Sequence, residues 1–324
     1  MEIHQILIEA DPHSLLKSEQ IFLSKYPDYS VSMKRYFLSS SEQKEALCTA
    51  FRHLPESGSY AVSFVIQPVL GEGNIAVWLY LTKDSPVELI WSTNLVSRKA
   101  GSEEQTREIL ETYESDLDAK GLSMSDNCVR TWFYVDDIDK NYGGVVVGRR
   151  DNFSAIGMTK DTHYLASTGI AGKAVEPGTI VQMDALALSG DFSQYYLHAP
   201  SNFNPTHEYG VTFERGVVLE YGGESHVLVS GTASIDNKGN IVHPGDVYAQ
   251  ALRMLENVEA LLSESFSEWD DVKMTVIYLR NASDYEKVEP IFRHRFHNRI
   301  PYVITLAPVC RPGWLIEMEC LAVY

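Results

Sequence analysis

The sequence has the composition of an ordinary globular protein, with 324 residues of which 44% are hydrophobic and 22% charged. Its length allows two domains, and its net charge of −17 argues against general binding to nucleic-acid phosphates. The apolar runs are shorter than the ~18 residues of a membrane-spanning helix, and no basic region marks a signal peptide at the N-terminus.

Cysteine and histidine usage gives no sign of a metal site. The four cysteines, at positions 48, 128, 310 and 320, include no CxxC pair, and the 10 histidines form no HxxxH or HxH motif. This pattern argues against a disulfide framework and favours a reducing compartment. We therefore expect a cytoplasmic protein without a metal site, and from the net charge and the short apolar runs one that binds neither nucleic acid nor membrane.

Residues 1–55 are expected to form an N-terminal accessory segment. Apolar residues have helical spacing over 14–26 and 40–54, and nothing in the segment indicates chemistry. From Tyr60 the chain becomes richer in β-branched and aromatic residues. Two apolar runs flank the turn at Gly71–Asn74 and predict a β-hairpin.

Strands and helices alternate through the rest of the first half. Ser102 and Gln105 resemble a capping box for a helix that Gly121 ends. A second helix is predicted before Phe153. Strands are predicted at 87–92, 128–135 and 179–189.

The second half repeats this order. Two strands flank Gly222-Gly223 and predict a hairpin, and Asp246 is the expected N-cap of a helix with one apolar face. The remaining predicted elements are a strand at 273–279, a helix at 284–298 and a closing strand at 315–324.

The repeat is visible in the residues themselves. TWFY at Thr131–Tyr134 matches TVIY at Thr275–Tyr278, and MDALAL at Met183–Leu188 matches MECLAV at Met318–Val323. We therefore predict an α/β (α+β) fold of two tandem units, 56–204 and 205–324, each a mixed sheet backed by helices. The first unit has Gln182 where the second has Glu317, which favours a functional role for that acid.

Two carboxylates, Glu317 and Glu319, interrupt the apolar closing strand. Side chains alternate along a strand, so both acids should face the same side. Burial of two acids at this spacing leaves two alternatives open. Either the acids are structural, because they pair with arginine or lysine or lie in an edge strand, or they belong to a site in which one of them stays protonated.

Other residues suggest a pocket for an anion. Arg149 and Arg150 follow one another in GRRDNF. Arg215 lies in an otherwise apolar strand, where an arginine needs an acid partner or an anionic ligand. The segment VSGTASID at Val229–Asp236 has small residues that let a ligand approach the backbone, or it is a plain turn. Cys310 is expected to shape a pocket rather than to act as a nucleophile.

The second unit resembles the RidA/YjgF family of small trimeric α/β proteins (chorismate mutase-like fold, endoribonuclease L-PSP-like). The resemblance covers about 120 residues and rests on VSGTASID, HPGD, ALRMLENVEALL, VKMTVIYL and IEMECLAVY. It implies that Glu317 matches the acid of that family. RidA deaminases hold a substrate carboxylate with an arginine at the position of Val303, so the clamp of an imine deaminase is missing.

A longer resemblance, to chorismatases of the FkbO type, covers most of the chain outside residues 1–55. It rests on the segments VRTWFYVDDID, GRRDNF, ASTGIAG, MDALALS, EYGVTFERG, SGTASID, GDVYAQALRMLENVEALL and VCRPGWLIEMEC. It implies cleavage of chorismate to pyruvate and a hydroxybenzoate or a dihydroxycyclohexadienoate. The product is expected to depend on pocket residues such as Ala233 and Cys310.

Enol-ether cleavage starts with proton transfer to the vinyl methylene carbon, and this step needs an acid that is protonated near neutral pH. Glu317 is the predicted catalytic acid, and the reaction implies no metal or organic cofactor, because the substrate supplies its own electron sink. Two alternatives stay open, a RidA-like enamine or imine deaminase and a non-catalytic protein that binds an aromatic acid. The expected partner is a small dicarboxylate, and the protein acts either as a monomer or as a homo-oligomer such as a trimer. The predicted substrate-binding residues are Arg150, Tyr209, Arg215, Gly231, Ala233, Cys310, Arg311 and Glu319.

Overall fold

The computed structural model describes residues 1–51, 60–297 and 299–324. Within them the chain folds into three units of the same topology. In each unit the first and central strands pair antiparallel with the closing strand, and the third strand pairs parallel with the central one. Helices follow the first and central strands of each unit, so each unit is built as βαβαββ.

Unit 1 spans 2–82, and its strands lie in the order β1-β4-β2-β3. Its elements are β1 (Glu2–Glu9), α1 (Pro12–Leu23), β2 (Ser30–Leu38), α2 (Ser41–Phe51), β3 (Ala61–Ile66) and β4 (Ile75–Thr82).

Unit 2 spans 88–189, and its strands lie in the order β5-β8-β6-β7. Its elements are β5 (Glu88–Val96), α3 (Ser102–Asp118), α4 (Met124–Asn127), β6 (Cys128–Val135), α5 (Ile138–Ala155), β7 (Ala166–Ala171) and β8 (Val181–Ser189).

Unit 3 spans 193–323, and two added strands extend its sheet to the order β13-β12-β14-β11-β10-β9. Its strands are β9 (Ser193–Leu197), β10 (Gly216–Tyr221), β11 (Glu224–Ala233), β12 (Val272–Leu279), β13 (Tyr302–Leu306) and β14 (Ile316–Val323). Its helices are α6 (Val247–Glu264), α7 (Tyr285–Phe296) and the short 3-10 turns Thr206–Tyr209, Trp269–Asp271 and Ala282–Asp284.

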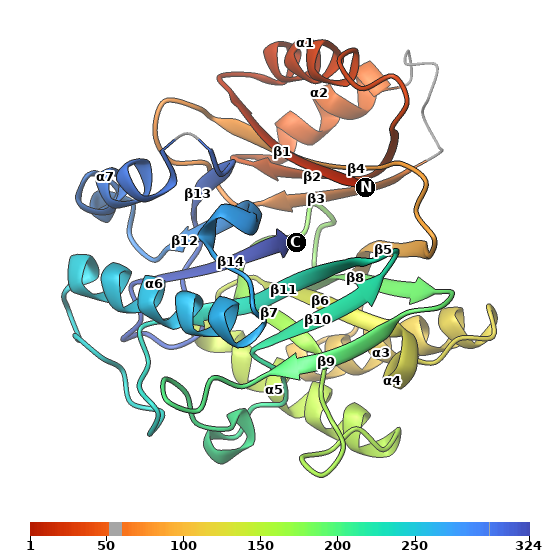
Figure 1. Cartoon of the computed structure of the whole chain (residues 1–324), viewed down its shortest axis with the longest axis vertical. Helices are drawn as coiled ribbons and strands as arrows, with labels where there is room; N and C mark the ends of the chain where they lie inside the picture. Colours follow the sequence, from red (N-terminus) through yellow and green to blue (C-terminus); the bar gives the residue numbers. More distant parts are fainter. Residues whose placement is uncertain (52–59, 298) are drawn as a thin grey trace.

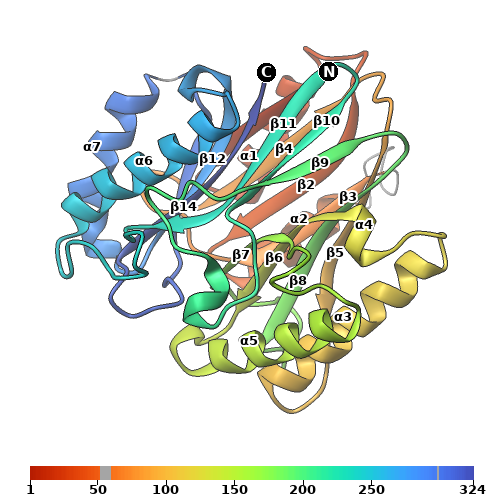
Figure 2. The ribbon, with the colours of Figure 1, turned by 60° about the horizontal axis from the view of Figure 1, so that its bottom comes forward.

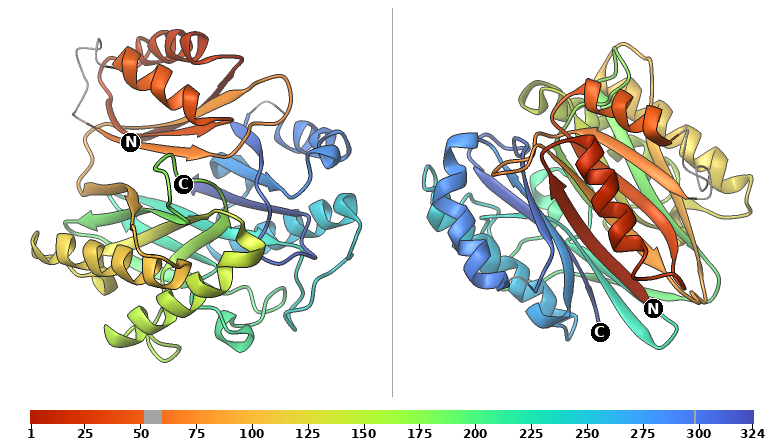
Figure 3. Two further views of the ribbon diagram at one scale, coloured as in Figure 1. Left: turned by 180° about the vertical axis from the view of Figure 1, so that it is seen from behind. Right: turned by 90° about the horizontal axis from the view of Figure 1, so that it is seen from above.

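The three units close into a ring. One residue of the third strand of each unit bridges to the loop before the closing strand of a neighbour, in the pairs Ile66–Lys173, Thr305–Val69 and Ile170–Val309. The helices lie on the outside of this ring and the sheets face its centre (Figures 1 and 2). A single apolar cluster fills the centre and draws on all three sheets, with Trp78, Trp132 and Val276 among its members. Figure 3 shows the same arrangement from behind and from above.

The register of the central strands makes the three units comparable residue by residue. Each central strand (β2, β6 and β12) has a bulge in its pairing with the closing strand. Counted from this bulge, the third residue pair occupies one structural position in all three units, and the fifth pair occupies another. The third pair places Trp78, Asp184 and Glu319 at one position. The fifth pair places Ala76, Gln182 and Glu317 at the next position on the same face. The predicted correspondence of Gln182 with Glu317 is therefore confirmed.

The division of the chain differs from the prediction in two ways. Residues 1–55 are not an accessory segment, because β1 and β2 pair with β4 and β3 in one sheet, and a boundary at residue 55 cuts through that sheet. The predicted hairpin around Gly71–Asn74 is wrong, because β4 lies between β1 and β2 and does not pair with β3. The segment therefore belongs to a unit with its own sheet, which makes three units in the described chain instead of the two that were predicted.

Most other predicted elements are confirmed within one to three residues. The hairpin at Gly222-Gly223 forms, and Asp246 caps α6 by accepting a hydrogen bond from the N–H of Ala249. The predicted capping box is wrong: Ser102 is the first residue of α3 and Gly101 precedes it, while Gln105 bonds to the backbone of Lys99, Ile180 and Val181. The predicted helix at 40–54 corresponds to α2, and its last three residues lie outside the described part of the chain.

Candidate active site

A cavity of about 270 Å³ lies where unit 2 meets unit 3. Unit 2 contributes one face of α5 and the strand β7, and unit 3 contributes β11, the start of β14 and the loops before β10 and β14. The lining residues are Tyr142, Gly143, Val146, Arg149, Ser167, Gly169, Tyr209, Gly210, Val211, Phe213, Arg215, Gly231, Ala233, Ile235, Cys310, Arg311, Trp314 and Glu317.

Glu317 enters the cavity from β14 and is 4% exposed. Among the described residues, no ion pair or hydrogen bond engages its carboxyl group. Burial raises the pKa of Glu317 to about 8, and the negative charge of Glu319 adds to the rise against the opposing effects of Arg130 and Arg215. The backbone of Gly231 lies directly against it, since a Cβ on Gly231 would stand 2.2 Å from Oε1 of Glu317. The acid is therefore held in place and protonated at neutral pH.

Arg215 is buried in the cavity wall among aromatic rings. Its guanidinium carbon lies 4.6 Å from the ring centroid of Phe203 and 5.4 Å from that of Tyr209. Its Nη2 donates to the carbonyl of Asn204 at 3.3 Å, while its buried Nε has no hydrogen-bond partner within the described residues. Burial lowers the pKa of Arg215, and within the described residues no carboxylate forms an ion pair with it.

Arg311 stacks on the other aromatic residues of this wall. Its guanidinium lies 4.6 Å from the ring of Tyr209 and 4.8 Å from that of Trp314. It donates one hydrogen bond, to the carbonyl of Gly239 at 3.3 Å. Tyr209 thus contacts two guanidinium groups, and burial raises the pKa of its hydroxyl, so the phenol remains a neutral donor.

Arg149 reaches the cavity from α5 on the opposite side. It is 1% exposed, and its Nε and Nη1 contact only hydroxyl groups, of Thr212 at 3.2 Å and Ser167 at 3.4 Å. Its buried Nη2 has no partner in the described part of the chain. Arg149, Arg215 and Arg311 therefore converge on the cavity with no carboxylate within ion-pair distance among the described residues, which is an arrangement suited to an anionic ligand.

Seven predicted site residues line the cavity together. These are Tyr209, Arg215, Gly231, Ala233, Cys310, Arg311 and Glu317. Desolvation raises the pKa of Cys310 to about 12, so its thiol stays neutral and fits a role in shaping the cavity.

Two predicted residues are not in the cavity. Arg150 is exposed and bonds to Asp151 at 2.9 Å, because it lies about 100° around α5 from Arg149. Glu319 is buried two residues further along β14, where it bonds to Arg130 at 2.9 Å and to Trp132. Each of the two alternatives for these acids thus holds for one of them. Glu319 forms a structural ion pair, and Glu317 lines the cavity.

The lining residues that were not among the predicted site residues include Tyr142, Arg149, Ser167 and Trp314. A signal for Arg149 was present, because Tyr142, Val146 and Arg149 are spaced by four and three residues and so share one face of a helix. Val303, at the position of the deaminase arginine, is buried in β13 and does not line this cavity.

A larger cavity, of about 1090 Å³, lies at the corresponding junction of units 3 and 1. It differs in the groups that matter for chemistry. Ala76 stands at the position of Glu317, and Arg293, which lines this cavity, is paired with Glu289 at 2.7 Å. Only the junction of units 2 and 3 combines a protonated acid with uncompensated arginines among the described residues.

No group of three or more histidine, cysteine, aspartate or glutamate side chains is placed to hold a metal ion in residues 1–51, 60–297 and 299–324. Nor does any helix in those ranges have the length and apolar character needed to cross a membrane.

Comparison with known proteins places unit 3 in a family. The family model described as Endoribonuclease L-PSP matches residues 219–324. The 3-aminoacrylate deaminase RutC of Acinetobacter baylyi is 32% identical over 98 residues, which are 30% of this chain and 77% of that protein. The chain belongs to the Endoribonuclease L-PSP family. A RutC family protein of Saccharolobus solfataricus is 31% identical over 97 residues, again 30% of this chain and 77% of the relative.

The match to the Endoribonuclease L-PSP family explains one third of the chain, and one solved structure covers nearly all of it. A chorismatase crystal structure aligns with a TM-score of 0.68 over 99% of this chain and 98% of that chain, at 17% sequence identity. The likeness establishes a chorismatase-like fold over the whole chain, with the family domain at its C-terminal end.

Proposed function

We propose that this protein is an enzyme that cleaves the enolpyruvyl ether of chorismate, with Glu317 as the general acid. The observation that carries the proposal is the junction of a neutral carboxylic acid with three uncompensated arginines in one cavity between units 2 and 3. Chorismate has two carboxylates and one acid-labile enol ether, so its charges and its reactive group match these two features. The chorismatase-like fold supports the same substrate class.

The chemistry requires one proton at carbon. The O–H bond of Glu317 breaks as a C–H bond forms at the vinyl methylene, and the positive charge is shared by the neighbouring carbon and the ether oxygen. The carboxylate of Glu317 that remains stabilises this oxocarbenium ion electrostatically. Addition of water and loss of the ring alcohol give pyruvate and a dihydroxycyclohexadienoate. Loss of pyruvate with aromatisation gives a hydroxybenzoate with no net uptake of water.

The arginines have a binding role in this scheme. A dianion entering the cavity gains charge-assisted hydrogen bonds to Arg149 on one wall and to Arg215 and Arg311 on the other. The aromatic rings of Tyr209 and Trp314 cover part of the cavity and lower its dielectric constant, which strengthens these contacts. Glu317 is neutral before the reaction, so it does not repel the substrate.

The similarity to the 3-aminoacrylate deaminase favours a second candidate, the hydrolysis of an enamine acid. Protonation of an enamine at the alkene carbon β to nitrogen gives an iminium ion, just as protonation of an enol ether gives an oxocarbenium ion. Both substrates therefore need the same neutral acid beside an anion-binding group. They differ in charge, because the enamine acid has one carboxylate and leaves two arginines without a partner.

The test is release of pyruvate from chorismate, followed by coupling to NADH oxidation with lactate dehydrogenase. We expect turnover by the wild-type protein and a loss of about 10²–10⁴-fold in kcat for Glu317→Gln, with binding little changed. Ammonia release from 3-aminoacrylate, measured in parallel, decides for the second candidate. Folded wild-type protein that releases no pyruvate at any pH between 5 and 9 would rule out the proposed reaction.

A further inference from the structure

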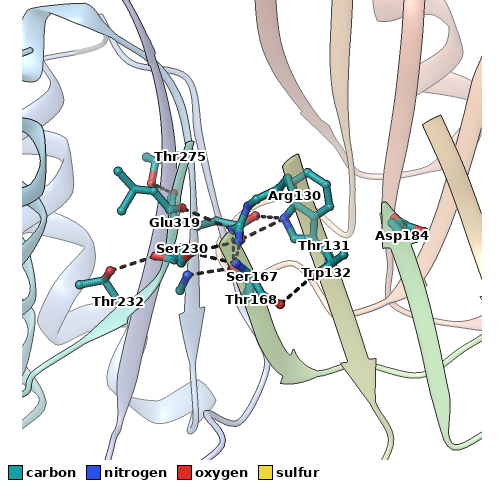
Figure 4. A network of polar contacts seen from close by, with 12 residues as sticks. Arg130, Thr131, Trp132, Ser167, Thr168, Asp184, Ser230, Thr232, Thr275 and Glu319 are labelled. Carbon is teal, nitrogen blue, oxygen red and sulfur yellow. Dashed lines mark hydrogen bonds and ion pairs between the residues drawn. The ribbon is translucent and has the colours of Figure 1, made fainter. Parts of the chain in front are cut away.

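Glu319 is a buried acid whose carboxylate accepts hydrogen bonds from three residues. Its Oε2 accepts hydrogen bonds from Nη2 of Arg130 at 2.9 Å and from the hydroxyl of Thr168, and its Oε1 accepts one from the indole N–H of Trp132 at 2.9 Å. All three donors come from β6 and β7 of unit 2, whereas Glu319 comes from β14 of unit 3 (Figure 4). The contact therefore joins the two units whose junction forms the cavity.

The same contacts lead to Glu317. The hydroxyl of Thr168 also accepts a hydrogen bond from the backbone N–H of Gly231 at 2.9 Å. Gly231 in turn is the residue whose backbone lies against Oε1 of Glu317. Glu319 and Glu317 are two residues apart on one face of β14, about 7 Å along the strand. The network thus fixes both the strand that holds Glu317 and the backbone that packs on its carboxyl group.

We infer that Arg130 and Thr168 are positioning residues for Glu317, acting through Glu319, and that the Arg130–Glu319 pair keeps the charge next to the acid compensated. The inference rests on the proposed function only in naming Glu317 as the acid that reacts. Both residues belong to unit 2, so unit 2 tunes an acid that unit 3 supplies.

Titratable and charged groups from several elements surround Glu317. They are Glu319 from its own strand, Arg130 from β6, Tyr142 and Arg149 from α5, Tyr209 and Arg215 from the segment before β10, and Cys310 and Arg311 from the loop before β14. Tyr142 and Cys310 are neutral, since burial raises the pKa of each above its usual value. Of the remaining charges, Glu319 and Arg130 oppose one another at 2.9 Å and act on Glu317 with opposite signs.

Removing one member of the pair exposes Glu317 to the other. Glu319→Gln leaves Arg130 as a buried cation without a carboxylate, which favours the ionised form of Glu317. We expect the titration midpoint of Glu317 to fall by about one pH unit. In the double variant Arg130→Met/Glu319→Gln neither charge is present, and the midpoint should return toward its wild-type value. Methionine suits the position, because Met33 and Met274 occupy it in the other two units.

The experiment measures this midpoint without substrate. Infrared difference spectra over pH 5–10 record the protonated carboxyl band that disappears in Glu317→Gln, and the kcat profile with chorismate is measured alongside. A lower titration midpoint of Glu317 in Glu319→Gln, together with a recovered midpoint in the double variant, supports the inference. Because the infrared midpoint is independent of turnover, it stands even if chorismate is not cleaved, and failure of the proposed function is recognised separately.

Asp184→Asn is the matched control. Asp184 occupies the position of Glu319 in unit 2 and pairs with the buried Arg35 at 3.0 Å. Its loss should destabilise the fold to a similar degree without moving the midpoint of Glu317. Equal midpoints in wild type and Glu319→Gln, or equal shifts in Glu319→Gln and Asp184→Asn, would overturn the inference. If Glu319→Gln does not fold, Thr168→Val carries the test, with a lower kcat and an unchanged KM expected.

Discussion

Glu317 combines two properties that oppose stability. It is buried without an ion pair or a hydrogen bond among the described residues, and it lies two residues from a second acid. In contrast, Asp184 and Glu319, which are equally buried, each have an arginine within 3.0 Å. An acid left in this state is kept neutral by its surroundings, and that neutrality is what a proton donor at carbon requires.

The stability of the protein should therefore depend on Glu317 in a defined pH window. The pKa of Glu317 is about 8 in the fold and 4.5 when exposed, so the folded state holds its proton more tightly than the unfolded state does. Stability contributed by this group is complete below pH 4.5 and is lost as the pH rises toward 8. Glu317→Gln should match the wild type at pH 4.5 and exceed it by about 3–5 kcal/mol at pH 8. Urea unfolding at the two pH values measures the difference, and equal stability at pH 8 would contradict the raised pKa.

Arg149 and Arg150 offer a matched pair of variants, because they are adjacent in sequence and differ in position around α5. Arg149→Met removes a buried guanidinium from the cavity and should weaken binding of a dicarboxylate by about 10–100-fold. Arg150→Met removes an exposed group paired with Asp151 and should leave binding unchanged. Isothermal titration with chorismate on the Glu317→Gln background, in which turnover is expected to be about 10²–10⁴-fold slower, measures both. Equal affinities for the two variants would remove Arg149 from the site.

Substitution of Gly231 tests how closely the position of the Glu317 carboxyl group must be maintained for activity. A methyl group there would lie 2.2 Å from Oε1 of Glu317 and 3.1 Å from Cγ2 of Thr168, so the carboxyl group has to move. A displacement of about 1 Å can reduce a rate by about 10²-fold, so Gly231→Ala should lower kcat by that order with the melting temperature nearly retained. Wild-type turnover in this variant would show that the carboxyl group has other room.

At the residue scale the sequence identified the acid and six other residues of the cavity, but not the separate role of Glu319. Glu317 could be predicted because it breaks an apolar strand and because its counterpart in the repeat is Gln182. Glu319 breaks the same strand, and its ion pair with Arg130 spans 189 residues of sequence, which no local pattern contains. The choice of Arg150 over Arg149 is a different kind of error, since the phase of α5 was available in the sequence.

At the scale of elements, α5 is positioned by close contact with α3. Gly144 and Gly148 form the contact, and a Cβ on either would approach the backbone of Glu103 to within 2.8 Å. The two glycines let the helices come closer than larger residues allow. They thereby set the height at which Tyr142 and Arg149 enter the cavity.

Gly148→Ala should separate the two helices and destabilise the protein by about 1–3 kcal/mol. Gly143→Ala is the control on the same helix, because nothing lies within 4 Å of its added Cβ. Alanine there should stabilise α5 by up to about 1 kcal/mol. Denaturant unfolding distinguishes the two, and similar changes of stability in both variants would contradict the close-packing argument.

Elements that pair with their sequence neighbours were predictable, and those that pair at a distance were not. The hairpin at Gly222-Gly223 was found because β10 and β11 are adjacent in both sequence and sheet. The runs around Gly71–Asn74 have the same local pattern, yet β4 inserts between β1 and β2. The pairing of β4 depends on the whole sheet, because β4 pairs there with both β1 and β2, whereas a hairpin would give it one partner.

At the scale of the whole molecule, the three units occupy one another's contact surfaces. The bridges Ile66–Lys173, Thr305–Val69 and Ile170–Val309 are all made within one chain. We therefore expect no trimer of the kind that three separate units would form, and a mass of 36.5 kDa in solution. Light scattering after size exclusion measures it, and a mass three times larger would contradict this prediction.

The fold class was predictable for units 2 and 3, whereas unit 1 was missed. The matching segments in units 2 and 3 keep similar residues at similar spacing, as in TWFY and TVIY. In unit 1 the corresponding stretch of β2 is Lys34–Phe37, with two cations in a buried strand, and the closing strand has Ala76 and Trp78 in place of the acids. Topology is retained there while the residues that reveal it have changed.

The joining of three units in one chain also changes what a single substitution can do. In an assembly of three identical subunits, every substitution at a junction is repeated at all three junctions, so a group suited to chemistry at one has to be tolerated at the others. Here the same structural position is occupied by Ala76, Gln182 and Glu317. Each junction can thus vary alone, and a destabilising neutral acid is needed at one place while the other two remain free to hold the molecule together.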